Sequence, residues 1–377
     1  MKALSVPENI ICEANAMENN PGLLSQHGRK ALIVTGPHVG HSMMMERLKN
    51  VLDGENVEYS VFDRITGEPT DNMIADGIAA YRSAGCDFLI GFGGGSPLDS
   101  AKAVAAIIGN GGQIADYMGK EISNPVPPVV AIPTTAGTGS EATRFTIITD
   151  TSKGVKMLLK GDALLPRTAI VDYTLGMDAP GNVTAATGLD ALTHAVEAYI
   201  SRKATPETDR LAEDAVRRIV KYLPLAYRDG SNREARETMA RAALDAGICI
   251  NNSSVTVVHG MSRPIGAMFH VPHGLSNAML LVTCMNDLSR EAESRFAALS
   301  RIVGDEDNDF VAVMARISKS CNVPTMEGYG IDRLQYMAAI GKMSADAMAS
   351  GSPANAPKAY TEEDCRRLYV AAYDCVI

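Results

Sequence analysis

The stretch that decides the fold reads GFGGGSPLDSAK and runs from Gly91 to Lys102. The apolar run that ends at its first glycines, DFLIGF, predicts a buried strand, and the three glycines that follow predict a tight turn. We expect a helix over Ser96–Ile108, with Ser96 as its N-cap and Pro97 in the first helical position. A strand that passes through a glycine turn directly into a helix is typical of α/β proteins.

The same turn is a candidate anion site. Backbone N–H groups can approach a phosphate closely where no side chain intervenes, and a helix N-terminus attracts negative charge. Gly93, Gly94, Gly95 and Ser96 are therefore candidates to bind a pyrophosphate. A glycine turn with a capped helix would look the same, and the segment is not the G-x-G-x-x-G fingerprint. The motif alone leaves both interpretations open.

The surrounding sequence alternates short apolar runs with helical stretches. We expect further strands over Lys30–Thr35, Val57–Phe62 and Val129–Ile132, and helices over Ser42–Gly54 and Asp71–Ser83. Strands separated by helices of ten or more residues predict a wound parallel sheet with helices on both faces. Such sheets bind ligands at the carboxyl ends of their strands.

A second polar cluster, IPTTAGTGSEAT, follows the strand at 129–132. Thr134, Thr135 and Thr138 offer hydroxyl groups to a ribose or phosphate. Lys156, further along the chain, is a candidate to contact a ribose. The alternatives are a surface loop and a solvated lysine. Two such loops at strand ends of one sheet favour a ligand crevice over either alternative taken alone.

The composition changes near residues 174–185, and almost all that follows has helical periodicity. Helices are expected over Thr187–Ile200, Thr208–Tyr222, Asn232–Cys249, Ala292–Ile302, Phe310–Cys321, Ile331–Ala347 and Thr361–Ala372. We therefore predict two domains: residues 1–180 as a dinucleotide-binding α/β domain and residues 181–377 as an all-helical, metal-binding domain.

Composition limits the partners and the compartment. The chain has 377 residues, 46% of them hydrophobic, and a net charge of −9, which argues against nucleic acid or an anionic membrane as partner. Its seven cysteines are scattered without a C-x-x-C pair, as expected in a reducing compartment. We see no signal peptide and no apolar stretch long enough to span a membrane. The expected location is the cytoplasm.

Three histidines lie within sixteen residues in HGMSRPIGAMFHVPHG, from His259 to Gly274. Upstream, GLDALTHAVEAY places Asp190 and His194 four residues apart in a predicted helix, where they share one face. Together with His259 and His273 they would supply one oxygen and three nitrogen ligands, a set that suits Fe²⁺, Zn²⁺ or Mn²⁺. Asp–His pairs also form ordinary hydrogen bonds, so the spacing alone does not decide the matter.

Five segments, in order along nearly the whole chain, resemble those of the group III, iron-containing alcohol dehydrogenases. They are GGGSPLDSAK, PTTAGTGSEAT, ATGLDALTHAVEAYIS, VVHGMSRPIGAMFHVPHGLSNAMLL and SGSPANAP. The chain is most similar to the small-aldehyde branch of that family: ethanolamine-operon ethanol dehydrogenase, 1,3-propanediol dehydrogenase and lactaldehyde reductase.

This resemblance implies the wound-sheet domain and the helical domain of the dehydroquinate synthase-like architecture. It also implies a homo-oligomer built on dimers, a divalent metal (Fe²⁺ foremost) and NAD or NADP, with NAD favoured. By position, the implied metal ligands are Asp190, His194, His259 and His273. The implied cofactor contacts are Gly93, Gly94, Gly95 and Ser96 on the pyrophosphate, with Thr134, Thr135, Thr138 and Lys156 near the nucleotide.

Two positions depart from the family pattern. Gly36 stands where lactaldehyde reductase-type members carry an acidic residue against the adenosine ribose, which opens the site to NADP, and Ser42 could assist a 2′-phosphate. Arg263 stands where several relatives have a histidine assigned to proton relay, and arginine is a poor proton shuttle. It is either a structural arginine or an anion anchor. His270, ribose hydroxyls and water then become the candidates to protonate an alkoxide.

The predicted function is the metal-dependent, NAD(P)-linked, reversible reduction of a short-chain aldehyde to the alcohol. One alternative is an anionic aldehyde as substrate, such as sulfoacetaldehyde or a semialdehyde. Another, from a different class, is a dinucleotide-binding regulatory protein with a structural metal. Structural zinc sites are usually rich in thiolates, and no cysteine lies in the ligand motifs. A dehydroquinate synthase-like cyclase would need a basic cluster that the sequence lacks.

Overall fold

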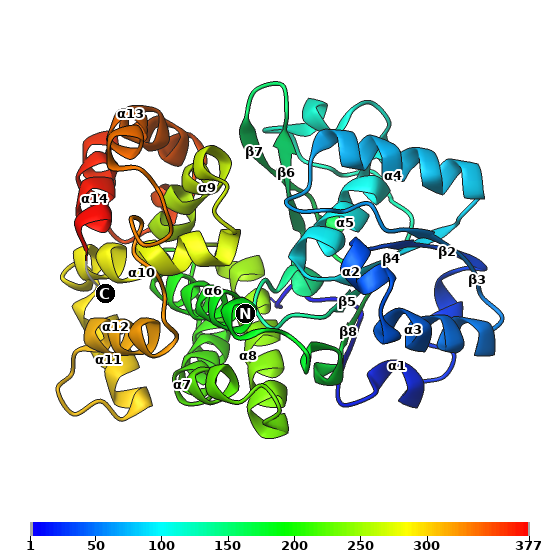
Figure 1. Ribbon diagram of the computed structural model, residues 1–377, viewed down its shortest axis with the longest axis horizontal. Helices are drawn as coiled ribbons and strands as arrows, with labels where there is room; N and C mark the ends of the chain where they lie inside the picture. The colour runs from blue at the N-terminus through cyan, green and yellow to red at the C-terminus, as the bar shows by residue number, and fades with distance from the viewer. Residues whose placement is uncertain (1–2, 376–377) are drawn as a thin grey trace. The chain divides into compact units, whose positions relative to one another are not determined.

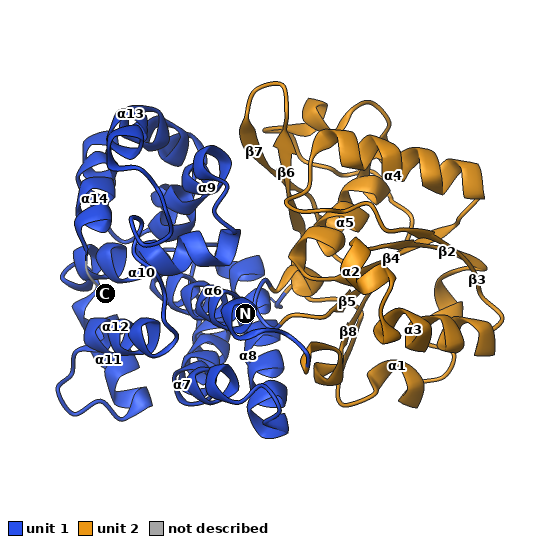
Figure 2. Cartoon of the chain, in the orientation of Figure 1, with its two compact units in different colours: residues 1–4, 136–138, 178–377 blue, residues 5–135, 139–177 orange. Residues whose placement is uncertain are grey.

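The structure is a computed structural model that describes residues 3–375. The chain forms two compact units (Figure 2), which we describe separately. The α/β unit comprises residues 5–135 and 139–177, and the helical unit comprises, of the described residues, 178–375 together with 3–4 and 136–138. A parallel-sheet domain followed by a helical domain is the fold class that the sequence predicts, and the structure confirms it.

The α/β unit is built on a six-stranded parallel sheet (Figure 1) in the order β1-β8-β5-β4-β2-β3. The strands are β1 (Asn9–Cys12), β2 (Lys30–Val34), β3 (Glu58–Phe62), β4 (Phe88–Gly93), β5 (Val129–Pro133) and β8 (Thr168–Val171). Strands β2 to β5 lie within about one residue of the predicted ranges. The two edge-side strands β1 and β8 were not predicted, because four residues are too few to show a clear period.

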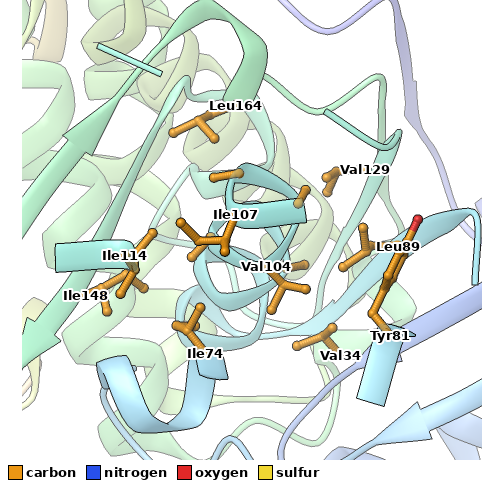
Figure 3. Packing of buried hydrophobic residues seen from close by; sticks show 14 of the residues in the cluster. Val34, Ile74, Tyr81, Leu89, Val104, Ile107, Ile114, Val129, Ile148 and Leu164 are labelled. Atoms are coloured by element: carbon orange, nitrogen blue, oxygen red, sulfur yellow. The ribbon is translucent and has the colours of Figure 1, made fainter. Parts of the chain in front are cut away.

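Helices cover both faces of this sheet. They are α1 (Ala16–Asn19), α2 (Pro37–Gly40), α3 (Met43–Gly54), α4 (Asp71–Ala84) and α5 (Gly95–Asn110). On β2, Leu32 and Val34 belong to the cluster that includes residues of α4 and α5 (Figure 3), whereas Ala31 and Ile33 belong to the cluster that includes residues of α1 and α3. Because both faces are buried, the strands read as continuous apolar runs.

An antiparallel hairpin, β6 (Phe145–Asp150) and β7 (Val155–Lys160), adds to the α4/α5 face. Ile148, Met157 and Leu159 join that cluster. The sequence analysis did not recognise this hairpin. FTIITD does not alternate apolar and polar residues, although its burial alternates in the structure, so the local signal was limited to the turn at residues 151–154, which ends on Gly154 with φ +62°.

The order of the sheet reverses beside β2. The chain runs from β2 out to β3 and then returns to place β4 on the other side of β2. Ligands bind in such sheets outside the carboxyl ends of the strands at this switch point. Gly36 follows β2 there, and the glycine turn follows β4.

The helix after the glycine turn starts earlier than predicted. Helix α5 begins at Gly95 and its N-cap is Gly94, so the prediction of Ser96 as N-cap is wrong. Gly94 is extended, with φ −73° and ψ −168°, whereas Gly95 already has helical geometry. No side chain caps this end of α5. The first backbone N–H groups of the helix therefore lack the hydrogen bond that a capping side chain would provide.

A buried lysine on α5 fixes the polar segment that follows β5. Lys102 Nζ donates hydrogen bonds to Ser140 O at 3.1 Å and Phe145 O at 2.5 Å, and lies 3.1 Å from Asp99 Oδ1. Asp99 in turn accepts hydrogen bonds from Ser140 Oγ and from the Ile147 backbone N–H. The helix that starts at the glycine turn is therefore tied to the 134–143 loop and to β6.

The helical unit contains nine helices in its described residues. They are α6 (Gly181–Ile200), α7 (Pro206–Arg228), α8 (Arg233–Ser253), α9 (Val257–Phe269), α10 (His273–Ser289), α11 (Glu293–Val303), α12 (Phe310–Ser320), α13 (Arg333–Ala349) and α14 (Glu362–Asp374). From Gly188 to Ile200 every residue of α6 is buried, and α6 packs against α7, α8 and α10. Helix α6 starts six residues before its predicted start at Thr187. Within residues 3–375, the helices are too short or too polar to traverse a lipid bilayer.

One buried acid in the 134–143 loop makes stability depend on pH. Burial raises the pKa of Glu141 to about 7. A raised carboxyl pKa means that the folded state keeps its proton longer, so this contribution is complete below about pH 4.5 and is lost as pH rises through 7. Relative to Glu141→Gln, the wild-type free energy of unfolding should fall between pH 4.5 and 7 by on the order of 2–3 kcal/mol. Urea unfolding of both proteins across this range measures the difference, and parallel curves would contradict the prediction.

Candidate metal centre

Helix α6 carries the first two members of the site. Asp190 and His194 lie one turn apart, and both are buried, with exposed fractions of 1% and 4%. His194 Nε2 lies 3.7 Å from Asp190 Oδ1. The α6 backbone therefore holds a carboxylate and an imidazole on one face, as the i,i+4 spacing predicts.

Helices α9 and α10 bring the other two imidazoles to the same carboxylate oxygen. His259 on α9 places Nε2 3.6 Å from Asp190 Oδ1, and His273, the first residue of α10, places Nε2 3.9 Å from it. The rings of His194 and His259 stack with centroids 4.6 Å apart. The chain turns between α9 and α10 at His270, which has a left-handed backbone with φ +55°.

The four side chains fit a single divalent cation. One atom from each lies within 4.8 Å of the others. Two ligand atoms bound at about 2.0–2.2 Å to one ion are separated by roughly 3–4 Å, which matches the distances from Asp190. A carboxylate with three imidazoles is a donor set for Fe²⁺, Zn²⁺ or Mn²⁺. The structure thus brings together the four residues that the sequence singled out.

At Asp190 and His194, the electrostatics favour the protonation states that bind a metal. Burial lowers the pKa of His194 to about 4, so this ring is neutral at neutral pH. Burial alone would raise the pKa of Asp190, but the charges of His194 and His273 and the contact with His259 hold it well below its usual range. A neutral imidazole and an ionised carboxylate are the forms that bind metals.

Glu197 orients His259 from the side away from Asp190. Its Oε2 lies 2.6 Å from His259 Nδ1, and its Oε1 accepts hydrogen bonds from Thr256 Oγ1 at 2.6 Å and from the Val258 N–H at 2.7 Å. A carboxylate on Nδ1 fixes that proton and leaves Nε2 free to act as a ligand. The sequence analysis missed Glu197, although it lies one helical turn after His194 within the quoted motif.

Asn277, one turn after His273 on α10, was also missed. Its Nδ2 lies 2.7 Å from Asp190 Oδ1, 3.0 Å from His259 Nε2 and 3.3 Å from His273 Nε2. Its Oδ1 is buried without a hydrogen-bond partner in the described residues. Asn277 therefore adds an amide to the carboxylate and the imidazoles at the centre of the site.

The candidate cofactor residues in the α/β unit gather at two adjacent strand ends. Strands β4 and β5 pair in parallel, and the Thr134 N–H donates to Gly93 O at 2.8 Å. A Cβ on Gly94 would lie 3.6 Å from Thr135 Oγ1, so the two loops run side by side. The glycine turn and the threonines at 134–135 thus form one polar edge of the sheet, next to Ser96 in the first turn of α5.

Four further cofactor candidates have distinct settings. Gly36 is the N-cap of α2 and has no room for a side chain, because a Cβ there would lie 2.8 Å from Ile65 O. Ser42 is the N-cap of α3 and donates its hydroxyl to Val39 O. Lys156 is not the solvated residue that was one alternative: its side chain is 4% exposed and pairs with Glu68 at 3.1 Å. Thr138 belongs with the helical unit.

The two remaining site candidates, His270 and Arg263, differ sharply in exposure. His270 is exposed at the end of α9. Arg263 is buried on α9, one turn after His259, and donates a hydrogen bond from Nη1 to Ser352 Oγ at 2.9 Å.

Both units match one family. Residues 7–173 match the iron-containing alcohol dehydrogenase domain, and residues 184–373 match the C-terminal domain of the Fe-containing alcohol dehydrogenase family. The chain therefore belongs to the iron-containing alcohol dehydrogenase family, as its motifs suggest, and is an oxidoreductase of the alcohol dehydrogenase class.

Individual relatives span nearly the whole chain. It is 35% identical over 330 residues to NAD-dependent methanol dehydrogenase of Bacillus methanolicus, covering 85% of this chain and 86% of the relative. It is 34% identical over 365 residues to 1,3-propanediol dehydrogenase of Klebsiella pneumoniae, covering 92% of each. A crystal structure of 1,3-propanediol oxidoreductase superposes with a TM-score of 0.94 at 33% identity, covering 99% of this chain and all of that one.

We predict that Glu197→Gln weakens metal binding without unfolding the protein. The substitution keeps the shape of the side chain but removes the charge that fixes the His259 proton. Loss of a hydrogen-bonding partner behind a ligand typically lowers metal affinity about 10- to 100-fold. Competition with a chelator measures the dissociation constant. Glu213→Gln, which alters the acceptor of the Tyr199 hydroxyl on α7, is the matched control. Equal affinities for wild type and Glu197→Gln would contradict the prediction.

A close contact between α10 and α6 yields a second prediction. A Cβ on Gly274 would lie 2.5 Å from Ala186 O and 3.2 Å from Asp190 Cβ, so Gly274→Ala must push the two helices apart. Overpacking of this kind costs about 1–3 kcal/mol and would move His273 away from Asp190.

We expect Gly274→Ala to lower both the melting temperature and the metal content. Gly341→Ala in α13 is the control, because its nearest neighbour to an added Cβ is the flexible end of Arg366 at 3.7 Å. Metal analysis and thermal unfolding of the purified variants test this. Full metal content in Gly274→Ala would show that the helix spacing is not critical.

Proposed function

We propose that this protein is a metal-dependent, NAD(P)-linked dehydrogenase that interconverts short-chain aldehydes and alcohols. In the reducing direction, the aldehyde takes up a hydride from NAD(P)H and a proton, and gives the alcohol and NAD(P)⁺. The observation that supports the proposal most strongly is the convergence of Asp190, His194, His259 and His273 on one point in the helical unit.

A divalent ion held by these four residues, Fe²⁺ foremost, would supply a Lewis acid that polarises the carbonyl oxygen. The chain's own residues prepare the site for it. Asp190 stays ionised, His194 stays neutral, and Glu197 holds the His259 proton on Nδ1. The donor set has no thiolate, which favours a catalytic rather than a purely structural metal. This weighs against a regulatory protein.

The nucleotide is proposed to bind at the switch point of the α/β sheet. Gly93, Gly94 and Gly95 would present backbone N–H groups to the pyrophosphate, and the N-terminus of α5, which has no capping side chain, adds a favourable dipole. Thr134 and Thr135 lie at the adjacent strand end. At Gly36 no carboxylate repels a 2′-phosphate, so we propose that the enzyme uses NAD or NADP. NAD is favoured because one relative is an NAD-dependent methanol dehydrogenase.

We further propose that the enzyme acts in the cytoplasm as a dimer-based homo-oligomer, on small molecules rather than on nucleic acid or membranes. The net charge of −9 and the scattered cysteines, which include no C-x-x-C pair, support this setting.

The function is tested by the loss of NADH or NADPH absorbance with short aldehydes. We expect turnover in metal-loaded protein, loss of turnover after chelation, and recovery on addition of Fe²⁺. His259→Ala and His273→Ala should each lose tightly bound metal and most activity, because each removes one of four ligands. Arg290→Met, which changes an exposed residue of the helical unit, is the control. Full turnover in chelated protein or in His259→Ala would refute the proposal.

A further inference from the structure

A buried lysine or arginine needs hydrogen-bond or charge partners. One that lacks them within the protein, and that the proposed mechanism does not use, is a candidate to bind a ligand. Among residues 3–375, the lysines and arginines that are buried as whole residues are Lys102, Arg236 and Arg263. Burying a charge is costly unless hydrogen bonds or an opposite charge replace the lost water.

Lys102 and Arg236 have partners for all their side-chain nitrogens. Lys102 is surrounded by backbone and hydroxyl oxygens and by Asp99. Arg236 uses all three nitrogens: Nε donates to Gly230 O at 3.0 Å, Nη1 to Thr184 Oγ1 at 2.8 Å and Nη2 to Ala179 O at 2.9 Å. A buried arginine with a purely structural role thus looks like Arg236 in this fold.

Arg263 does not follow that pattern. Its guanidinium donates one hydrogen bond, from Nη1 to Ser352 Oγ at 2.9 Å, and its Nε is buried with no partner among the described residues. It forms no ion pair within 4.0 Å in the described chain. Guanidinium carries five N–H donors, so most of its capacity is unused.

The acid that interacts electrostatically with Arg263 already has hydrogen-bond partners of its own. Glu197 acts on the charge of Arg263, but its two oxygens accept hydrogen bonds from Thr256, Val258 and His259. Burial lowers the pKa of Arg263 to about 10, which still leaves it protonated at neutral pH. The guanidinium is therefore a buried positive charge without a partner of its own.

The net charge of the site, with a divalent ion bound, favours the binding of an anion. A divalent ion, Asp190 and Glu197 sum to zero with neutral imidazoles, as +2, −1 and −1. Arg263 adds one positive charge to this buried set. Charges in a poorly hydrated interior interact strongly, so the completed site favours an additional anion.

Arg263 is placed to reach a substrate. It lies four residues after His259 on α9, and side chains at this spacing share a helix face at a separation of about 5–6 Å between Cβ atoms. A molecule with its carbonyl oxygen at the His259 end and an acidic group two or three carbons away spans a similar length.

We propose that Arg263 binds an acidic group of the substrate, so that the preferred substrate is a short aldehyde carrying a carboxylate or a sulfonate. This inference rests on the proposed dehydrogenase function and specifies its substrate class. Planar guanidinium groups pair with such oxyanions through two parallel hydrogen bonds, which Nε and one Nη group can supply.

The test combines binding with kinetics on the metal-loaded, full-length protein. Calorimetry measures the binding of 3-hydroxypropionate, 2-hydroxyethanesulfonate and, as the neutral match, propan-1-ol. Steady-state assays compare sulfoacetaldehyde and malonate semialdehyde with propanal. The variants are Arg263→Met, Arg263→Lys and the exposed control Arg290→Met.

We expect the wild type to bind at least one of the two anionic alcohols at least tenfold more tightly than propan-1-ol. Arg263→Met should lose that preference by about 10- to 100-fold, mainly through a higher KM for the anionic aldehydes. Arg263→Lys should recover part of it, and Arg290→Met should match wild type. The stronger of the two anionic ligands identifies the acidic group.

Two results would overturn the proposal. One is a wild type that shows no preference for anionic ligands, which needs no variant to fold. The other is an equal loss for neutral and anionic ligands in Arg263→Met, which would mark a structural arginine. A protein that reduces propanal without any anionic preference would refute the anchor alone. A protein that reduces no aldehyde with either nucleotide would refute the dehydrogenase proposal, and the calorimetry would still report on Arg263 separately.

Discussion

The structure of the helical unit depends on one buried carboxylate. Asp190 is 1% exposed, and three imidazole nitrogens lie 3.6–3.9 Å from a single oxygen of its side chain. An ionised carboxylate in an apolar interior is strongly unfavourable unless positive charge or hydrogen bonds replace water. Asn277 supplies one hydrogen bond, and the convergence of three more nitrogen donors points to a cation as the remaining compensation. Helices α6, α9 and α10 together enclose this group, while the apolar residues of α6 provide the free energy of its burial.

The enclosure is achieved by precise spacing of helices rather than by large side chains. The close approach of α10 to α6 at Gly274 sets the distance of His273 from Asp190. On the other side, Glu197 connects α6 to the first turn of α9 through three hydrogen bonds, so that His259 cannot rotate without breaking them. Asp190, His259 and His273 are therefore each held by their own backbone and by a second contact, which keeps the site assembled in a bundle made mostly of Ala, Leu, Ile and Val.

Sequence reasoning recovered the parts of the fold whose residues act locally. Helical spacing was sufficient for Asp190 and His194, and continuous apolar runs were sufficient for β2 to β5. It missed β1 and β8, which are four residues long and are defined by the neighbours they pair with. Ser96 was predicted as the N-cap of α5 because serine caps helices better than glycine. The helix instead begins at Gly95, within the glycine turn. Glu197 and Asn277 were missed because their roles depend on which helix lies opposite, which no single segment reveals.

The position of Arg263 shows why a ligand motif does not specify a substrate. In the proposed enzyme, the ligands would determine what happens at the reacting oxygen, and a neutral set of metal, Asp190 and Glu197 would serve an uncharged aldehyde well. A protonated guanidinium one turn away changes the net charge of that enclosure without changing the ligands. Because burial makes an unpaired charge unfavourable, the free protein keeps Arg263 at a cost that a bound anion relieves. Arg236 shows that this fold can satisfy a buried arginine completely when its role is only to pack. The incomplete set of partners at Arg263 is thus better explained by a ligand than by packing.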